Sequence, residues 1–382
     1  MTPDNDDETQ LALDAPVRGG GAVVAAAPML PGRYDDLCRI GGGAFGEVHR
    51  VRDTLFDRVV AMKLLRASHA DRAAVRRRFL VEAQITAQLQ HPGIVAVYDR
   101  GELPDGRLWF TMKEVRGRTL GGVIDELHAH KEPDGFRPVP SGWTFRRLID
   151  AFARIAQAIA YAHSRGVVHR DLKPDNLMVG EFGEVLVMDW GLARRVGTEG
   201  GEGGELDEAA GSGASSPALT HHGDVLGTPA YMSPEQARGD TARHGPSTDV
   251  YALGAVLHCL LTGRAPYHGT LDEVMAALVS GPAVRVADAA LGGPPLPAEL
   301  VAVCERAMRR DITERHASAE ALAADVVAWL DGRSHVLPDD IARIFPATMG
   351  HRLFFSPLYE TRRAQIADAL AAQILQRVPT PR

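Results

Sequence analysis

Cysteine is scarce in this sequence, which limits the kinds of site that the chain can form. Cys38, Cys259 and Cys304 are the 3 cysteines among 382 residues, and they are far apart and odd in number. A disulfide framework or a zinc site needs paired or closely spaced ligands, so both are disfavoured. We expect reduced thiols in the core or on the surface.

Long apolar runs and an excess of positive charge are also missing. The apolar run Ala22–Leu30 is too short to span a bilayer, which takes about 18 apolar residues or more, and the acidic start Met1–Thr9 differs from the basic flank of a signal peptide. A formal net charge of -7 gives no general attraction to nucleic acid or to acidic membranes. We therefore expect a cytoplasmic protein with no membrane span and no nucleic-acid partner, whose substrate is a small molecule or a protein.

The apolar content is sufficient for a large folded domain. Apolar residues make up 45% of the sequence, which is ordinary for a globular protein. Two stretches differ from the rest. Residues 1–33 begin acidic and become rich in glycine and alanine, and residues 197–213 are a low-complexity sequence of glycine, glutamate and alanine. Neither could bury a core, so we expect a disordered leader and a disordered insertion.

The chemical centre of the sequence is the polar loop inside Val167–Leu177. Asp171 and Asn176 are five positions apart, with Lys173 between them. This set supplies a carboxylate to orient a hydroxyl, an ammonium to meet a phosphate and an amide oxygen to hold a metal, which is what phosphoryl transfer needs. The pattern H-R-D-L-x-x-x-N over residues 169–176 resembles the catalytic loop of protein kinases.

A glycine-rich hairpin is expected near the start of the folded chain. Gly41, Gly43 and Gly46 precede Val48, and backbone amides without Cβ atoms nearby can approach phosphate oxygens. A dinucleotide site would require a helix next, whereas a strand, Arg58–Leu64, follows here. The spacing therefore favours a triphosphate-binding hairpin.

Lys63 ends an apolar strand, where an unpaired ammonium would be costly to bury. Glu82 lies on the apolar face of the helical segment Asp71–Leu89, an equally unfavourable place for a lone charge. We therefore predict that Lys63 and Glu82 form an ion pair. The basic run Arg76–Arg78 on the same helix is either a solvated face or a dock for a phosphate.

Three longer motifs extend the resemblance. They are H-S-R-G-V-V-H-R-D-L-K-P-D-N-L at 163–177, V-M-D-W-G-L-A-R at 187–194 and G-T-P-A-Y-M-S-P-E at 227–235. Together they resemble bacterial serine/threonine protein kinases of the Pkn type over about Tyr34 to Asp331, with Trp190 where the family most often has Phe and Ser233 where it has Ala. The resemblance implies an α+β bilobal fold, with a small antiparallel-sheet N-lobe carrying one main helix at 34–115 and a larger helical C-lobe at 116–331.

The resemblance also implies a role for each site residue. Asp171 would accept or orient the hydroxyl proton, Lys173 would stabilise the moving phosphoryl group, and Asn176 and Asp189 would hold two Mg²⁺ ions. Lys63, paired with Glu82, would reach the α- and β-phosphates of ATP. The remaining nucleotide-binding residues implied are Ile40, Gly41, Gly43, Gly46, Val48, Ala61, Met112, Lys113 and Val115.

Further residues are expected to support or regulate this site. Asp249 would brace the catalytic-loop backbone, and the family pattern pairs Glu235 with Arg315. A phosphate on Thr220 would order the activation segment, so we predict autophosphorylation there.

Two other functions stay open. A pseudokinase scaffold would bind nucleotide without transfer, although it normally lacks one of the residues named above. A small-molecule kinase should lack G-T-P-A-Y-M-S-P-E, which is present. The sequence therefore favours a protein kinase with autophosphorylation.

The tail 332–382 has a different character. S-H-V-L-P-D-D-I-A-R-I-F, H-R-L-F-F and an amphipathic segment around Ala364–Val378 are similar to the C-terminal lid segment of MoxR-type AAA+ ATPases. The ATPase core is missing, since no G-x-x-x-x-G-K-[ST] occurs. We expect a helical appendage that packs on the rest of the chain or docks a regulatory partner.

Overall fold

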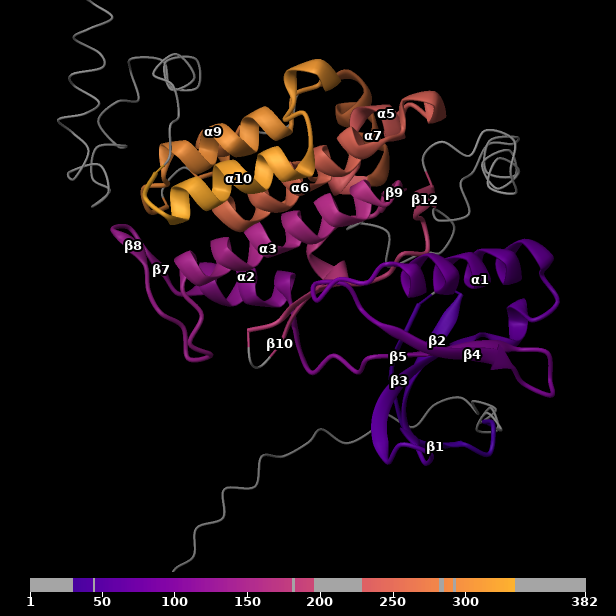
Figure 1. Cartoon of the computed structure of the whole chain (residues 1–382). Helices are drawn as coiled ribbons and strands as arrows, with labels where there is room; N and C mark the ends of the chain where they lie inside the picture. The colour runs from indigo at the N-terminus through magenta and orange to yellow at the C-terminus, as the bar shows by residue number, and fades with distance from the viewer. Residues whose placement is uncertain are drawn as a thin grey trace, which may run out of the picture.

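The computed structural model describes residues 30–43, 45–180, 183–195, 229–281, 285–290 and 293–333. These residues form a smaller lobe built on a β-sheet and a larger lobe built of helices (Figure 1). The predicted bilobal α+β architecture is confirmed. The predicted insertion 197–213, the predicted phosphorylation site Thr220 and residues 334–382 of the predicted appendage lie outside the described residues.

The small lobe is an antiparallel five-stranded sheet in the order β1-β2-β3-β5-β4. Its strands are β1 Tyr34–Gly42, β2 Gly46–Asp53, β3 Arg58–Leu65, β4 Val97–Glu102 and β5 Leu108–Met112. Its one long helix is α1, Ala73–Gln88, close to the predicted Asp71–Leu89.

The side chains of β3 alternate between two apolar clusters because successive residues of a strand point to opposite faces. Val60, Met62 and Leu64 belong to the outer cluster, whose members are Tyr34, Val51, Val60, Met62, Leu64, Leu103 and Trp109. Ala61 and Leu65 belong to the inner cluster, whose members are Ala61, Leu65, Phe79, Ala83, Val95, Leu108, Phe110 and Met112. Lys63 lies between Ala61 and Leu65 in this alternation, so it faces α1.

The large lobe contains the remaining long helices. They are α2 Leu120–Ala129, α3 Phe145–Ser164, α6 Pro246–Thr262, α7 Leu271–Ser280, α9 Ala298–Ala307 and α10 Ala319–Leu330. Two short helices, α5 Pro234–Ala237 and α8 Val286–Ala289, accompany them. The short strands of this lobe are β6 Gly117–Thr119, β7 Lys131–Glu132, β8 Gly135–Phe136, β9 Val167–Val168, β10 Leu177–Gly180, β11 Val185–Val187 and β12 Arg194–Arg195.

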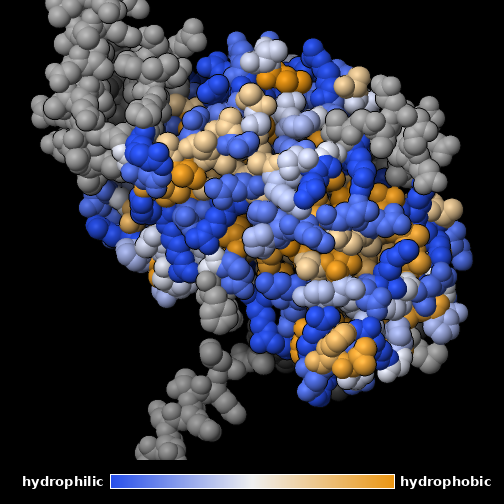
Figure 2. Space-filling model, in the orientation of Figure 1, coloured by the Kyte–Doolittle hydropathy of each residue, from blue (hydrophilic) through white to orange (hydrophobic). Residues whose placement is uncertain are grey.

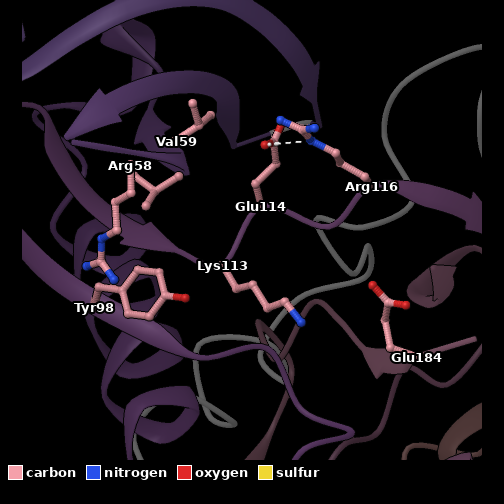
Figure 3. A pocket seen from close by; sticks show the side chains of 8 residues that line it. Arg58, Val59, Tyr98, Lys113, Glu114, Arg116 and Glu184 are labelled. Carbon is pink, nitrogen blue, oxygen red and sulfur yellow. Dashed lines mark hydrogen bonds and ion pairs between the residues drawn. The ribbon is translucent and has the colours of Figure 1, made fainter. Parts of the chain in front are cut away.

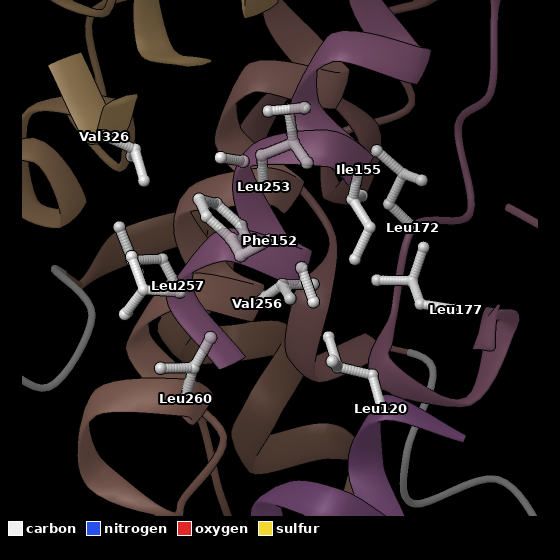
Figure 4. Close-up of a cluster of buried hydrophobic side chains, with 14 of the residues drawn as sticks. Leu120, Phe152, Ile155, Leu172, Leu177, Leu253, Val256, Leu257, Leu260 and Val326 are labelled. Carbon is white, nitrogen blue, oxygen red and sulfur yellow. The ribbon is translucent and has the colours of Figure 1, made fainter. Parts of the chain in front are cut away.

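Helices α3 and α6 form the centre of the large lobe. The Thr144 side chain accepts a hydrogen bond from the Arg147 amide and begins α3, and Gly166 follows the helix with a φ of 71°. Helix α6 has no polar face, and every residue from Thr248 to Thr262 is buried. Figure 4 shows the apolar core between these helices, where Phe152 and Ile155 of α3 lie among Leu253, Val256 and Leu257 of α6.

Strand β4 begins only at Val97, because Ile94 instead forms an isolated bridge to Val187. A short hairpin of β7 and β8 follows α2 along the chain. One predicted boundary differs from the structure. The predicted leader includes Arg33, yet Arg33 Nε lies 2.8 Å from Asp53 Oδ1, and Leu30 packs against the outer cluster. The folded chain therefore begins before residue 33.

On the face that Figure 2 shows, the surface of the described residues is mainly hydrophilic, with patches of apolar side chains between the polar ones. No helix in this part of the chain combines the length and the apolar character needed to cross a bilayer.

Candidate active site

The predicted nucleotide-binding residues of the sheet are cross-strand neighbours. Gly41 pairs with Val48, Val48 pairs with Lys63, and Lys63 pairs with Phe110, so one row of the sheet crosses β1, β2, β3 and β5. Gly46 begins β2, and a Cβ atom built there would lie 2.9 Å from the Leu64 carbonyl oxygen. Because this space is too small for a side chain, glycine is required where the hairpin passes over β3.

The wall of the cleft between the lobes is apolar. Ala61 pairs with Met112 across the sheet, both belong to the inner cluster, and Val48 packs against that cluster. Met188 from the large lobe packs there as well, and the sequence analysis missed it. Its position directly before Asp189 was the available signal. An apolar wall of this kind can hold a flat heterocycle.

Lys63 and Glu82 form the predicted ion pair, with Nζ and Oε1 2.6 Å apart. Lys63 Nζ also lies 3.7 Å from Asp189 Oδ1. Burial lowers the pKa of Lys63, but the charges of Glu82 and Asp189 outweigh burial, so the net pKa is raised. Lys63 is therefore a fixed cation in the cleft.

The catalytic-loop residues also meet as predicted. Asp171 Oδ2 lies 3.1 Å from Lys173 Nζ and accepts a hydrogen bond of 3.0 Å from Asn176 Nδ2. Asn176 Nδ2 also donates to the Asp171 carbonyl oxygen at 2.8 Å. Burial raises the pKa of Asp171, although the charge of Lys173 opposes that shift. A carboxylate with a raised pKa and an adjacent cation suits the acceptance of a proton.

Asp189 lies in an unusual backbone conformation at the end of β11. Its φ is 56°, and the φ of Arg170 is 70°; both are in the left-handed region that residues other than glycine rarely adopt. The side chain of Asp189 is half exposed, whereas the following Trp190 is buried and its ring centroid lies 4.6 Å from that of His169. The Trp190 packing thus turns the Asp189 carboxylate toward the cleft.

Asp249 braces the catalytic loop as predicted. Its carboxylate accepts hydrogen bonds from the amides of His169 and Arg170, both 2.8 Å long. His163 Nε2 lies 2.8 Å from Asp249 Oδ2, a contact that the sequence analysis missed. Burial raises the pKa of Asp249, but His163, His169 and the amide bonds outweigh burial and lower it overall.

Glu235 and Arg315 form a second buried support. The two guanidinium nitrogens of Arg315 each lie 2.8 Å from an oxygen of Glu235. Gln236 was missed by the sequence analysis: its Nε2 donates to the Arg170 carbonyl oxygen at 2.9 Å. The motif S-x-x-Q at 233–236 is a capping-box signature, and this was the available signal for the helix start that positions Gln236.

Four of the predicted nucleotide-binding residues make no contact that places them in the cleft, within the part of the chain that the structure describes. Ile40 is 49% exposed on β1. Lys113 belongs to the connector between the lobes, residues 113–116, and lines a pocket together with Glu114 (Figure 3). Gly43 lies beyond the end of β1, next to a residue outside the described part. Their roles as nucleotide contacts stay predictions, as does that of Val115.

Comparisons with known proteins agree with this geometry. Residues 34–327 match the family described as protein kinase domain, and residues 312–375 match the AAA lid domain. The serine/threonine-protein kinase PknD of Protochlamydia amoebophila is 36% identical over 304 residues, which are 79% of this chain and 30% of that protein. The serine/threonine-protein kinase PrkC of Bacillus subtilis is 33% identical over 305 residues, 79% of this chain and 41% of that protein.

A solved structure supports the fold. The kinase domain of PknI from Mycobacterium tuberculosis superposes with a TM-score of 0.56 and 24% identity, covering 80% of this chain and 100% of that one. The chain spans less than half the length of the curated relatives named above.

Proposed function

The chain belongs to the protein kinase family, and from this premise we propose that it transfers the γ-phosphoryl group of ATP to serine or threonine hydroxyls of proteins. The single observation that carries the proposal is the catalytic-loop group: Asp171 Oδ2 lies within 3.1 Å of both Lys173 Nζ and Asn176 Nδ2. The named relatives, PknD and PrkC, support the choice of serine and threonine.

The residues divide the work of an in-line transfer. Asp171 orients the attacking hydroxyl and accepts its proton, for which its raised pKa is suited. Lys173 stabilises negative charge on the moving phosphoryl group, and Lys63 positions the α- and β-phosphates of the substrate ATP. Glu82 holds Lys63 in place through the 2.6 Å ion pair.

The donor set suits Mg²⁺ bound together with ATP. Asn176 uses its amide nitrogen on Asp171, which leaves its Oδ1 for a cation, and the half-exposed Asp189 offers a carboxylate. These are the hard oxygen ligands that Mg²⁺ prefers, and their small number leaves positions for phosphate oxygens. Bound magnesium would neutralise charge on the phosphates. We propose two such ions, held by Asn176 and Asp189.

We also propose that the chain phosphorylates itself at Thr220. Gln236 and Asp249 hold the backbone of Arg170, so this arginine has a fixed place in the catalytic loop. A phosphothreonine there would add about two negative charges for such an arginine to bind.

A nucleotide-binding scaffold without transfer is the alternative, and one experiment separates the two. The full chain is incubated with ATP and Mg²⁺, and phosphate incorporation is compared with that of Asp171→Asn. The matched control is Asp175→Asn, since Asp175 is an exposed carboxylate in the same loop.

We expect Asp171→Asn to lose incorporation by a factor of about 100 or more and Asp175→Asn to keep catalytic transfer. Mass spectrometry of 197–231 should find phosphate on Thr220. A wild-type chain that binds ATP with normal affinity and transfers nothing, either to itself or to a panel of protein substrates, would establish the scaffold instead.

A further inference from the structure

A pocket lies at the connector between the lobes, residues 113–116, and contains none of the catalytic-loop residues. It has a volume of about 460 Å³ and is lined by Arg58, Val59, Val60, Tyr98, Lys113, Glu114, Arg116 and Glu184 (Figure 3). We call it the hinge-back pocket. The pocket uses the first residues of β3, Arg58–Val60, whereas the cleft residues Ala61 and Lys63 come later in the same strand.

The pocket lining has a small excess of positive charge. Arg58, Lys113 and Arg116 are its cations, and Glu114 and Glu184 are its carboxylates. Of its carboxylates, Glu114 is already paired, with Oε1 2.6 Å from Arg50 Nε and Oε2 3.2 Å from Arg116 Nε. Within the part of the chain that the structure describes, the Lys113 side chain has neither an ion pair nor a hydrogen bond. Lys113 is therefore a lining cation available to a carboxylate ligand.

The N-terminal end of the described chain lies beside this pocket. Asp53 forms two ion pairs there. Its Oδ1 lies 2.8 Å from Arg33 Nε, and its Oδ2 lies 3.5 Å from Nε of the pocket residue Arg58. Leu30, the first described residue, packs against the outer cluster, to which the pocket residue Val60 belongs. Residues 1–29 therefore join the folded chain next to the hinge-back pocket.

The sequence of this preceding segment complements the pocket. Residues 1–29 contain five carboxylates, Asp4, Asp6, Asp7, Glu8 and Asp14, and a single basic residue, Arg18. Glu8 is 22 positions before Leu30, and even an unstructured chain of that length spans about 25 Å on average. The acidic cluster 4–8 can thus reach a pocket adjacent to its point of attachment.

An apolar complement accompanies the charges. Leu55 and Phe56 are 68% and 63% exposed, and the Arg58 guanidinium lies 5.1 Å from the Phe56 ring centroid. The leader carries Leu11 and Leu13 directly after its acidic cluster. In the leader, acidic residues are therefore followed closely by apolar ones. On the surface near the pocket, a basic residue likewise lies next to exposed apolar ones.

We propose that the acidic leader, residues 4–8, docks in the hinge-back pocket, with its carboxylates bound by Lys113, Arg58 and Arg116. A tethered ligand of this length has an effective concentration of about 1 mM, so weak charge pairs suffice. The pocket joins β3, β4 and the connector to Glu184 of the large lobe. A docked leader thus contacts both lobes where the chain passes from one to the other. The docking does not depend on the proposed catalysis.

The scarcity of lysine provides a direct test. The chain has four lysines: Lys63, Lys113, Lys131 and Lys173. Carbodiimide treatment of the full chain joins a lysine to a carboxylate only when they are in contact, and peptide mass spectrometry locates the bond. We expect Lys113 to couple to carboxylates of residues 4–8 at least tenfold more than the exposed Lys131 of β7, which serves as the internal control.

Variants make the test specific to the pocket. Arg116→Glu, at a side chain 60% exposed, should lower coupling of Lys113 to the leader by about fivefold or more, because it replaces an attraction by a repulsion. Arg137→Glu, at an exposed arginine beyond β8, should leave coupling unchanged. Both variants are first shown to melt as the wild type does.

Three results would overturn the proposal. The first is equal coupling of the leader to Lys113 and Lys131. The second is coupling at Lys113 that Arg116→Glu does not reduce. The third is coupling found only between copies when ¹⁵N-labelled and unlabelled chains are mixed, which would assign the pocket to a second copy. Each result is independent of whether the chain transfers phosphate.

Discussion

Asp249 of α6 accepts hydrogen bonds from two consecutive backbone amides of the catalytic loop, those of His169 and Arg170, each at 2.8 Å. Arg170 has a φ of 70°, which costs conformational energy in a residue other than glycine. The carboxylate compensates by satisfying both amides at once. The conformation that presents Asp171 is thus held from the most deeply buried helix of the large lobe.

The first prediction concerns Asp249→Asn. The amide has one acceptor oxygen and one donor group, so it cannot accept from both backbone amides and also meet His163 as the carboxylate does. We expect the free energy of unfolding to fall by about 2–4 kcal/mol, measured by urea denaturation. The rate of phosphate transfer should fall even under conditions in which the Asp249→Asn chain is fully folded, because Asp171 loses its fixed position.

Asp272→Asn is the control for this prediction. Asp272 is exposed in the first turn of α7, and its substitution should change stability by less than about 0.5 kcal/mol. An Asp249→Asn chain with wild-type stability and activity would show that the brace is dispensable.

The second prediction concerns the buried pair of Glu235 and Arg315. Removal of one partner leaves an uncompensated buried charge, so Glu235→Gln should lower the free energy of unfolding by about 3–5 kcal/mol. Burial raises the pKa of Glu235, but Arg315 outweighs burial and lowers it overall. The stabilisation is therefore complete above the unfolded-state pKa of the carboxyl group and is lost as the pH falls through its folded-state pKa.

Urea denaturation at several pH values checks this sign. The difference in stability between wild type and Glu235→Gln should shrink toward acid pH. Arg137→Ala breaks only exposed pairs with Glu132 and Asp134 and should cost less than about 1 kcal/mol. A difference that grows toward acid pH would contradict the prediction.

The third prediction concerns the pH dependence of phosphate transfer. Burial raises the pKa of Asp171 above its ordinary value, and only the ionised carboxylate can accept the hydroxyl proton. The rate should therefore fall as the pH decreases through this raised pKa. Lys173 opposes the shift, so Lys173→Met should move the acid limb of kcat/KM to higher pH, in addition to lowering the rate.

Lys131→Met is the matched control, since Lys131 is an exposed lysine on β7, and its pH profile should equal that of the wild type. An acid limb that stays in place or moves to lower pH in Lys173→Met would show that Asp171 is not the titrating group.

Local patterns in the sequence predicted much of the fold. Thr144 and Gly166 mark the ends of α3 because capping depends on neighbouring residues only. The pair of Lys63 and Glu82 was also predictable, since each charge lies in an otherwise apolar element and requires a counter-ion. In both cases a short stretch carries the physical reason for its own structure.

Contacts between distant segments were harder to predict. Arg315 and Glu235 are 80 positions apart, and nothing around Arg315 indicates burial; only the family resemblance suggested the pair. The hairpin of β7 and β8 has two residues in each strand, too few to show alternation. It is held by the stacking of Phe136 on Phe145, with ring centroids 4.7 Å apart, which no local pattern reveals.

The fourth prediction concerns Gly254 in the middle of α6. A Cβ atom built there would lie 2.7 Å from Ala307 Cβ and 2.8 Å from Met308 Cγ, so the glycine permits close packing of α6 against α9. In an exposed helix, Gly→Ala would stabilise by about 1 kcal/mol. Here overpacking should exceed that gain, because it costs about 1–3 kcal/mol. We expect Gly254→Ala to lower the melting temperature.

The control for this prediction is Gly122 of α2, where the same change to alanine should not lower the melting temperature. A Cβ atom at Gly122 of α2 would meet its nearest neighbour, Thr119 Oγ1, at 3.5 Å, an ordinary contact. Gly122→Ala should therefore leave the melting temperature unchanged or raise it. The added change Ala307→Gly should restore part of the stability lost in Gly254→Ala, because it removes one of the two clashing carbons. A Gly254→Ala chain as stable as Gly122→Ala would mean that α6 and α9 can separate at little cost.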